Sequence, residues 1–160
     1  MRGVLISVYE NKRAARTLQY LSRIPSVLIA AAFAFVLCFN VIDGLYRESA
    51  VIASCALSGY ILVSIARRLI NAKRPYEEYS FYEVKPGKRE GCSFPSRHAY
   101  SAFSISVLTL SFNVYLAIAL FVLAALLCVC RVLLGIHYVR DVVCGALIGA
   151  LAGVIGIVIL

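Results

Sequence analysis

Four long apolar runs constrain the fold of this chain more than any other feature of its sequence. They cover residues 25–42, 49–66, 115–134 and 142–160, and each approaches the roughly 20 residues that an α-helix needs to cross about 30 Å of hydrocarbon. Only 15% of the residues are charged and 62% are hydrophobic, whereas roughly a quarter are charged in an average soluble domain. A soluble helical bundle would need polar helix faces, which these runs lack. The chain is therefore predicted to be a membrane protein.

A fifth apolar run, 99–112, is shorter than the other four. As a helix it would span only about 21 Å. We therefore predict that it begins below the membrane surface and lines a cavity walled by protein. The predicted fold is an all-α, polytopic membrane helix bundle of about five transmembrane helices, in one domain that covers residues 1–160 without an internal repeat.

The segment 1–23 mixes five basic residues with scattered apolar ones. It is predicted to be an N-terminal basic amphipathic segment, an arm that lies on an anionic membrane surface. An ordinary solvated flank of the first membrane helix is the alternative, and the sequence leaves both open.

Positive charge is distributed unequally between the two faces that five crossings would create. The N-terminal segment, the segment 67–97 and the link 131–141 share one face, and they hold every lysine and arginine except Arg47. The bias remains when the arginines considered below are set aside. By the positive-inside rule this face is predicted to be cytoplasmic, in a multi-pass protein of the cell membrane. Membrane lipids are the expected partners of its charge, and no nucleic acid is expected.

Both histidines of the chain fall on this same face, beside several arginines. His98 opens the short run and His137 lies between the last two runs, while Arg67 and Arg74 follow the second run. Arg67 and the adjacent Arg68 are either anchors that snorkel to the membrane surface or members of the group. Arg131 stands within an otherwise apolar helix, where a charge usually faces a partner or a water-filled cavity. Because guanidinium forks match phosphate oxygens, the expected ligand is a phosphate.

Asp141 follows His137 by four residues, about one helical turn. This pair is either a structural hydrogen bond or an arrangement that fixes the histidine tautomer for nucleophilic attack. The sequence has no third histidine, no Cys-x-x-Cys pair with matching partners and no Walker glycine loop. No metal site and no cofactor are therefore expected.

Three short segments carry these polar residues at fixed spacings: Arg67, six residues, Arg74-Pro75; Pro95-Ser96-Arg97-His98; and Cys130-Arg131, five residues, His137, three residues, Asp141. This order resembles the signature of the type-2 phosphatidic acid phosphatase family, also called lipid phosphate phosphatases. The family pattern is Lys, six residues, Arg-Pro; Pro-Ser-Gly-His; and Ser-Arg, five residues, His, three residues, Asp. The resemblance extends over residues 67–141.

The chain departs from the family pattern at three positions. Arg67 stands where the family has lysine, Arg97 where it has glycine, and Cys130 where it has serine. Arg97 is the most consequential, since glycine permits close backbone approach to a phosphate. An arginine there either restricts that approach or supplies another phosphate contact.

The resemblance implies a metal-independent membrane lipid phosphatase. His137 would attack phosphorus to form a phosphohistidine, Asp141 would orient its ring, and His98 would protonate the leaving oxygen and later activate water. The phosphate would be held by side chains from all three segments, namely Arg67, Arg74, Ser96, Arg97 and Arg131. Expected substrates are a polyprenyl phosphate or diphosphate, phosphatidic acid, phosphatidylglycerol phosphate or a phosphorylated glycolipid. The alternative is a non-catalytic membrane protein that binds or transports lipid phosphates.

Two further features have two interpretations each. The segment 67–97 is expected to form the active-site loop, and its aromatic and acidic part, 76–90, is either a lid or a solvated loop. Gly145, Gly149 and Gly153 give the last helix a small-residue face. That face either packs within the bundle or joins a second copy of the chain in a homo-oligomer.

Overall fold

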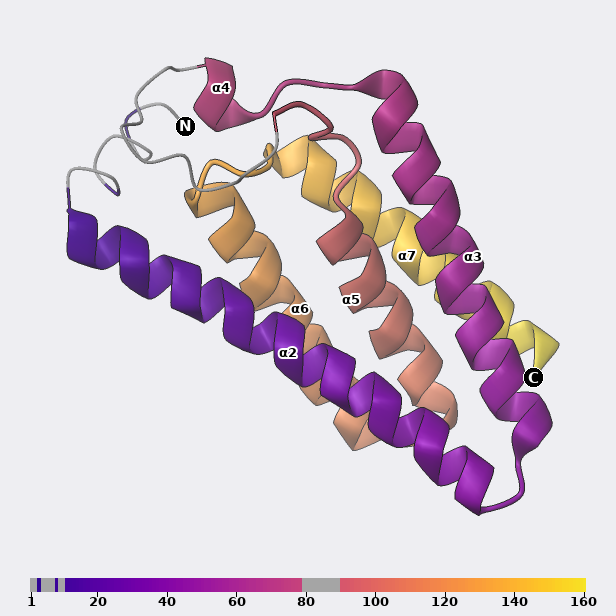
Figure 1. Ribbon diagram of the computed structural model, residues 1–160. Helices are drawn as coiled ribbons and strands as arrows, with labels where there is room; N and C mark the ends of the chain where they lie inside the picture. Colours follow the sequence, from indigo (N-terminus) through magenta and orange to yellow (C-terminus); the bar gives the residue numbers. More distant parts are fainter. Residues whose placement is uncertain (1–2, 4–7, 9–10, 79–89) are drawn as a thin grey trace.

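The described part of the chain consists of helices and their connections in a computed structural model, which describes residues 3, 8, 11–78 and 90–160 (Figure 1). The elements in chain order are α2 (Lys12–Ile42), α3 (Tyr46–Ile70), α4 (Pro75–Glu78), α5 (Arg97–Leu108), a 3₁₀ turn η1 (Thr109–Ser111), α6 (Val114–Leu133) and α7 (Val139–Ile159). The helices α2, α3, α6 and α7 are long and apolar enough to cross a membrane. The helix α5 has 12 residues and corresponds to the short fifth run. The all-α membrane bundle is therefore confirmed, with a helix count close to that predicted.

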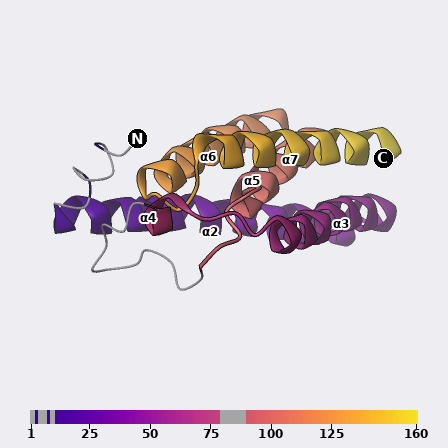
Figure 2. The same cartoon turned by 90° about the horizontal axis from the view of Figure 1, so that it is seen from above.

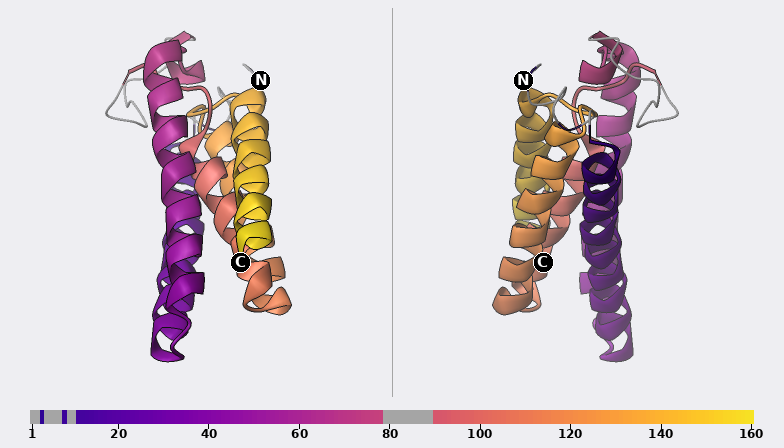
Figure 3. Two further views of the ribbon diagram at one scale, coloured as in Figure 1. Left: turned by 90° about the vertical axis from the view of Figure 1, so that its right-hand side faces the viewer. Right: turned by 90° about the vertical axis from the view of Figure 1, so that its left-hand side faces the viewer.

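The helices form two layers with α5 between them. Figure 2 shows α2 and α3 in one layer and α6 and α7 in the other, and Figure 3 shows the same arrangement from the sides. Most of α5 is buried, including Tyr100 and the residues from Ser104 to Leu108. Two cavities are lined in part by α5. The short run therefore forms the centre of the bundle and lines protein-walled space, as its length predicted.

The small-residue face of α7 packs against α5. A Cβ atom on Gly145 would lie 2.4 Å from the carbonyl oxygen of Ser96, and one on Gly149 would lie 2.3 Å from that of Tyr100. The two backbones thus approach more closely than any side chain would allow. The glycines serve packing within the bundle, and their face is covered by α5. A homo-oligomer formed through the last helix stays a prediction.

The first helix is longer than its apolar run. The run begins at residue 25, but α2 begins at Lys12, because the Asn11 side chain accepts hydrogen bonds from the backbone N–H groups of Arg13 and Ala14 at 3.1 and 3.2 Å. The helix then continues through Pro25. The later half of the predicted interfacial arm, 1–23, is thus continuous with the membrane helix. Most of the arm before residue 11 lies outside the described residues.

The connections lie at the two ends of the bundle as the crossings predicted. The α3–α5 connection and the α6–α7 link share one end, and the α2–α3 turn, the α5–α6 turn and the C-terminus share the other (Figures 1 and 3). Arg47, the basic residue of the second end, donates to the carbonyl oxygens of Leu160 and Ile159 at 2.8 and 3.1 Å. It therefore caps the C-terminal end of α7.

Candidate active site

The polar residues of the three segments gather at one end of the bundle. Arg67 lies in the last turn of α3 and Arg131 in the last turn of α6. His98 lies close to four other ionisable residues of the site, namely Arg67, Arg97, Arg131 and His137. Arg74 in turn lies close to both His137 and Arg131. Residues that are far apart in the sequence therefore form one cluster, as their shared face predicted.

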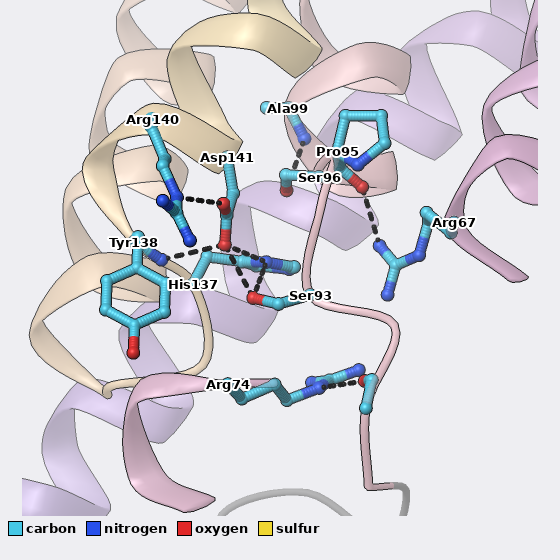
Figure 4. Close-up of polar contacts among 11 residues, drawn as sticks. Arg67, Arg74, Ser93, Pro95, Ser96, Ala99, His137, Tyr138, Arg140 and Asp141 are labelled. Atoms are coloured by element: carbon cyan, nitrogen blue, oxygen red, sulfur yellow. Dashed lines mark hydrogen bonds and ion pairs between the residues drawn. The ribbon is translucent and has the colours of Figure 1, made fainter. Parts of the chain in front are cut away.

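Arg67 and Arg74 hold the loop that precedes α5 (Figure 4). Arg67 is 5% exposed, and its Nη1 donates to the carbonyl oxygen of Pro95 at 3.1 Å. Nε of Arg74 donates to the carbonyl oxygen of Gly91 at 2.9 Å. A guanidinium has five N–H donors, so each arginine keeps donors for an oxyanion after fixing the loop. The snorkelling alternative does not describe Arg67, since its side chain is buried.

The loop bends at Gly91, where the backbone has a φ of +67°. A Cβ atom there would lie 2.3 Å from Oδ1 of Asn71, so a larger residue would displace Asn71. Two positions further on, the backbone N–H of Ser93 donates to the carbonyl oxygen of Ala72 at 2.8 Å. These contacts tie the loop to the end of α3 and fix the direction in which it enters the site.

Arg131 brings a buried donor to the cluster. Its Nε has no hydrogen-bond partner in the part of the chain that the structure describes. Burying a donor without a partner is unfavourable, and a charged group within a membrane helix usually faces a partner or a cavity. Nε of Arg131 is therefore available to a phosphate oxygen.

His137, Asp141 and Ser93 form a buried group beside the arginines. They are 1%, 0% and 0% exposed, respectively. The Ser93 hydroxyl donates to Oδ2 of Asp141 at 2.5 Å and lies 3.5 Å from Nδ1 of His137. Nδ1 itself lies 3.7 Å from Oδ2, which is longer than a direct hydrogen bond. The hydroxyl, the carboxylate and Nδ1 of the imidazole therefore form a triangle of close contacts (Figure 4).

The expectation that a helical turn joins His137 to Asp141 is wrong. The helix α7 begins at Val139, so His137 precedes it. Asp141 is near the helix start, where its Oδ2 accepts a hydrogen bond from the backbone N–H of Tyr138 at 3.0 Å. The backbone N–H of His137 donates to the carbonyl oxygen of Arg131 at 3.3 Å. A helix cap and the α6–α7 link, rather than helical spacing, therefore bring the two side chains together.

Burial lowers the pKa of His137 below its ordinary value. The nearby Asp141 carboxylate opposes this shift, and the charges of Arg67 and Arg74 add to it. The imidazole is therefore neutral near neutral pH. This is the form that has a lone pair for attack on phosphorus.

Ser96 caps the N-terminus of α5. Its side chain is completely buried, and its Oγ accepts a hydrogen bond from the Ala99 N–H at 3.4 Å. Its own N–H donates to the carbonyl oxygen of Asp141 at 2.9 Å. The first N–H groups of a helix have no partner within it and attract anions. Ser96 thus presents the start of α5 to the site, and its predicted direct contact with phosphate stays a prediction.

A groove between α2, α3 and α5 begins beside His98. A cavity of about 140 Å³ is lined by His98, Arg97 and Tyr60, among others. A second cavity, of about 250 Å³, shares Tyr60, Ser101 and Ile105 with it. We name the two together the α5 groove. Its walls are mostly apolar, and Leu57 at its rim is 59% exposed on the surface that a membrane would cover.

Arg97 lies where the groove meets the arginine cluster. Its guanidinium carbon lies 5.6 Å from the centre of the Tyr60 ring. Arg97 also lies close to Arg67. Arg68, by contrast, is exposed and takes no part in the cluster.

Ser93 was not among the residues predicted from the sequence. It lies outside the three spaced segments, and only the fold brings it to Asp141. In the parts of the chain that the structure describes, no group of three His, Cys, Asp or Glu side chains is placed to hold a metal ion. Most of the predicted lid, 76–90, lies outside the described residues.

Two solved structures are similar to this chain in fold. The crystal structure of Aquifex aeolicus LpxE is similar over 92% of this chain and 87% of its own, with a TM-score of 0.69 and 23% identity. A transmembrane PAP2-type phosphatidylglycerolphosphate phosphatase from Bacillus subtilis is similar over 96% of this chain and 88% of its own, with a TM-score of 0.55 and 18% identity. These two likenesses show the fold.

No curated protein matches the sequence. A family model does match it. The model of the PAP2 superfamily covers residues 48–160, which include all three spaced segments and every residue of the cluster. The chain therefore belongs to the PAP2 superfamily, the type-2 phosphatidic acid phosphatases that its motif order resembles.

Proposed function

We propose that this protein is an integral membrane lipid phosphatase that hydrolyses a phosphate monoester or diphosphate of a lipid through a phosphohistidine intermediate, without a metal ion. One observation carries the proposal. The buried group of His137, Ser93 and Asp141 lies beside a cluster of arginines, and the neighbouring His98 lines the head of an apolar groove. Nucleophile, phosphate ligands and space for a lipid tail thus meet at one place.

The first step transfers the phosphoryl group to His137. Nδ1 faces Asp141 and keeps its proton, so Nε2 attacks phosphorus while the bond from phosphorus to the leaving oxygen breaks. His98 donates its proton to that oxygen. Arg67, Arg74 and Arg131 hold the equatorial oxygens together with the N–H groups at the start of α5. The products of this step are the free leaving group and the phosphohistidine.

The second step hydrolyses the phosphohistidine. His98, which has lost its proton, accepts one from a water molecule whose oxygen attacks phosphorus. The bond between phosphorus and Nε2 breaks, inorganic phosphate leaves, and both histidines return to their starting forms. Positioning and charge stabilisation dominate phosphoryl transfer, and the arginines with the two imidazoles supply both.

The groove favours a lipid as the leaving group. Its lining is mostly apolar, and its rim is exposed where the bilayer would lie. A lipid can therefore place its tail in the groove and its phosphate in the arginine cluster. Polyprenyl phosphates and diphosphates, phosphatidic acid, phosphatidylglycerol phosphate and phosphorylated glycolipids all fit this description.

The test is release of phosphate by the purified protein from a panel of these lipids, with a metal chelator present. Turnover in chelator is expected, together with inhibition by vanadate, which can occupy the same oxyanion pocket. Activity abolished by chelator and restored by magnesium would refute the metal-independent mechanism. Binding of lipid phosphates without release of phosphate would favour the alternative of a lipid-phosphate binding or transport protein.

We further propose that the active-site end faces the cytoplasm of a cell membrane, since, among the residues that the structure describes, the lysines and arginines other than Arg47 lie at that end. Lys73 at the active-site end and Asp43 in the α2–α3 turn are both exposed. In a background without the native cysteines, Asp43→Cys should react with an impermeant thiol reagent in intact cells and Lys73→Cys should not. The reverse pattern would place the site on the outer face.

A further inference from the structure

Arg97 lies on the side of the site where the leaving group departs. His98, its neighbour in the chain, donates the proton to the leaving oxygen in the proposed mechanism. Both residues line the cavity of about 140 Å³ at the head of the α5 groove. A lipid whose tail occupies the groove must pass Arg97 directly after the scissile bond.

The Arg97 guanidinium is held at this place by an aromatic ring. Its carbon lies 5.6 Å from the centre of the Tyr60 ring, a cation–π contact that fixes its position. Among the residues that the structure describes, none forms an ion pair or hydrogen bond with it. Its other surroundings in the cavity include Ile29, Ala102 and Leu127. Arg97 is partly exposed, and its N–H donors can bind an anionic group that enters this cavity.

Lipid monophosphates and lipid diphosphates differ at this point. In a prenyl monophosphate or in phosphatidic acid the leaving oxygen is attached to carbon of an uncharged alcohol, so the group that passes Arg97 is neutral. In a diphosphate the leaving oxygen belongs to a second, inner phosphate. A guanidinium binds the oxygens of such a phosphate as a fork. We infer that Arg97, held by Tyr60, binds the inner phosphate of a lipid diphosphate and makes such lipids the preferred substrates.

This inference rests on the proposed function and specifies its substrate. Nε2 of His137 forms a bond with the outer phosphorus, and the bond between that phosphorus and the bridging oxygen breaks. His98 protonates the bridging oxygen, which departs as part of a lipid monophosphate held by Arg97. Water then releases the outer phosphate from His137 as inorganic phosphate. One water molecule is consumed, and no other reactant is needed.

The test compares farnesyl diphosphate with farnesyl monophosphate, which share one tail, by release of phosphate in detergent micelles. We expect a higher kcat/KM for the diphosphate. Arg97→Gly, which restores the residue of the family pattern, should lower that value roughly 10- to 100-fold, the range for a lost charged hydrogen bond. The monophosphate value should change less than about threefold. Arg68→Ala is the matched control, because Arg68 is exposed and outside the groove, and it should change neither value.

Equal losses for the two substrates in Arg97→Gly would show that Arg97 only supports the fold, and would overturn the inference. Tyr60→Leu removes the ring that positions the guanidinium. It should lower the preference in the same direction by a smaller factor, and an unchanged preference would contradict the role of Tyr60.

A binding measurement separates this inference from the proposed function. If the wild-type protein releases phosphate neither from these two lipids nor from any other lipid of the panel, the proposed function fails. The inference is then tested by titrating His137→Ala with the two lipids, with and without Arg97→Gly. Tighter binding of the diphosphate that is lost with Arg97 would support it, and equal binding of the two lipids would overturn it.

Discussion

The contact between α5 and α7 and the wall of the α5 groove are built in opposite ways. At the first, Gly145 and Gly149 bring α7 against the carbonyl oxygens of Ser96 and Tyr100, so backbone meets backbone. At the second, Tyr60 is 37% and Leu57 59% exposed, and side chains border open space. The chemistry is therefore positioned by contacts that tolerate little change. The choice of lipid depends on side chains that can be replaced without moving the helices.

The largest expected effect comes from removing the nucleophile His137, which lies beside the contact between α5 and α7. His137→Ala should lower kcat on the order of 10⁴- to 10⁶-fold, as for other groups that act as a unit. The acid-labile phosphoenzyme should disappear as well, while the arginines still bind the lipid. Trapping the phosphoenzyme with a radiolabelled substrate is the measurement.

His98→Ala provides the contrast for this experiment. An aryl phosphate needs little help to leave, so its first step should be spared compared with that of a lipid alcohol, for which general acid catalysis contributes about 10²- to 10⁴-fold. A phosphoenzyme that persists in His137→Ala, or equal losses for both leaving groups in His98→Ala, would show that the two roles are assigned wrongly.

Asp141→Asn should have the next largest effect, a loss in kcat of about 10²- to 10⁴-fold, because an amide does not hold the tautomer of His137. The pH profile gives a second readout. Neutral His137 is the active form, so activity falls as the pH drops through its pKa. Burial lowers this pKa and the carboxylate opposes that shift. Without the carboxylate the acid limb of kcat/KM should move to lower pH, and a move to higher pH would contradict the assigned role of Asp141.

The sequence predicted the helices well and the beginning of the first helix poorly. Hydropathy alone locates α3, α6 and α7 to within a few residues, since lipid-facing helices are apolar over their whole length. The start of α2 depends instead on Asn11, whose side chain caps a turn of basic residues and alanines. A hydropathy profile has no signal for such a cap.

The site divides in the same way. The three spaced segments identified the residues that the fold gathers, because all three lie at the same end of the bundle. Ser93 was not predicted, because it contacts Asp141, a residue 48 positions further along the chain. The position of Arg97 depends on Tyr60 of another helix. Such contacts between helices follow from packing and cannot be obtained from spacing within one segment.

Gly145→Ala tests the backbone contact between α5 and α7 directly. The added Cβ would lie 2.4 Å from the carbonyl oxygen of Ser96, so α7 must shift and carry Asp141 with it. A misplacement near 1 Å lowers turnover about 10²-fold, and we expect a loss in kcat of roughly 10- to 100-fold with KM little changed. Leu147→Ala is the control, because Leu147 is 67% exposed on the same helix. Full activity in Gly145→Ala would show that the helix packing around His137 and Asp141 tolerates an added Cβ better than the close contact indicates.

Ser101→Leu tests the groove and should have the smallest effect. Ser101 lines both cavities of the α5 groove one helical turn from Arg97, so a larger side chain there competes with the lipid tail. The groove opens at its rim and the tail is flexible, so KM for a long-chain lipid phosphate should rise only about fivefold, the lower end of the range for overpacking. An aryl phosphate has no tail and should be hydrolysed as before. Ser54→Leu, on the exposed surface of α3, should change neither substrate. A loss in kcat for the aryl phosphate in Ser101→Leu would mean that the groove and the backbone-packed site do not act independently.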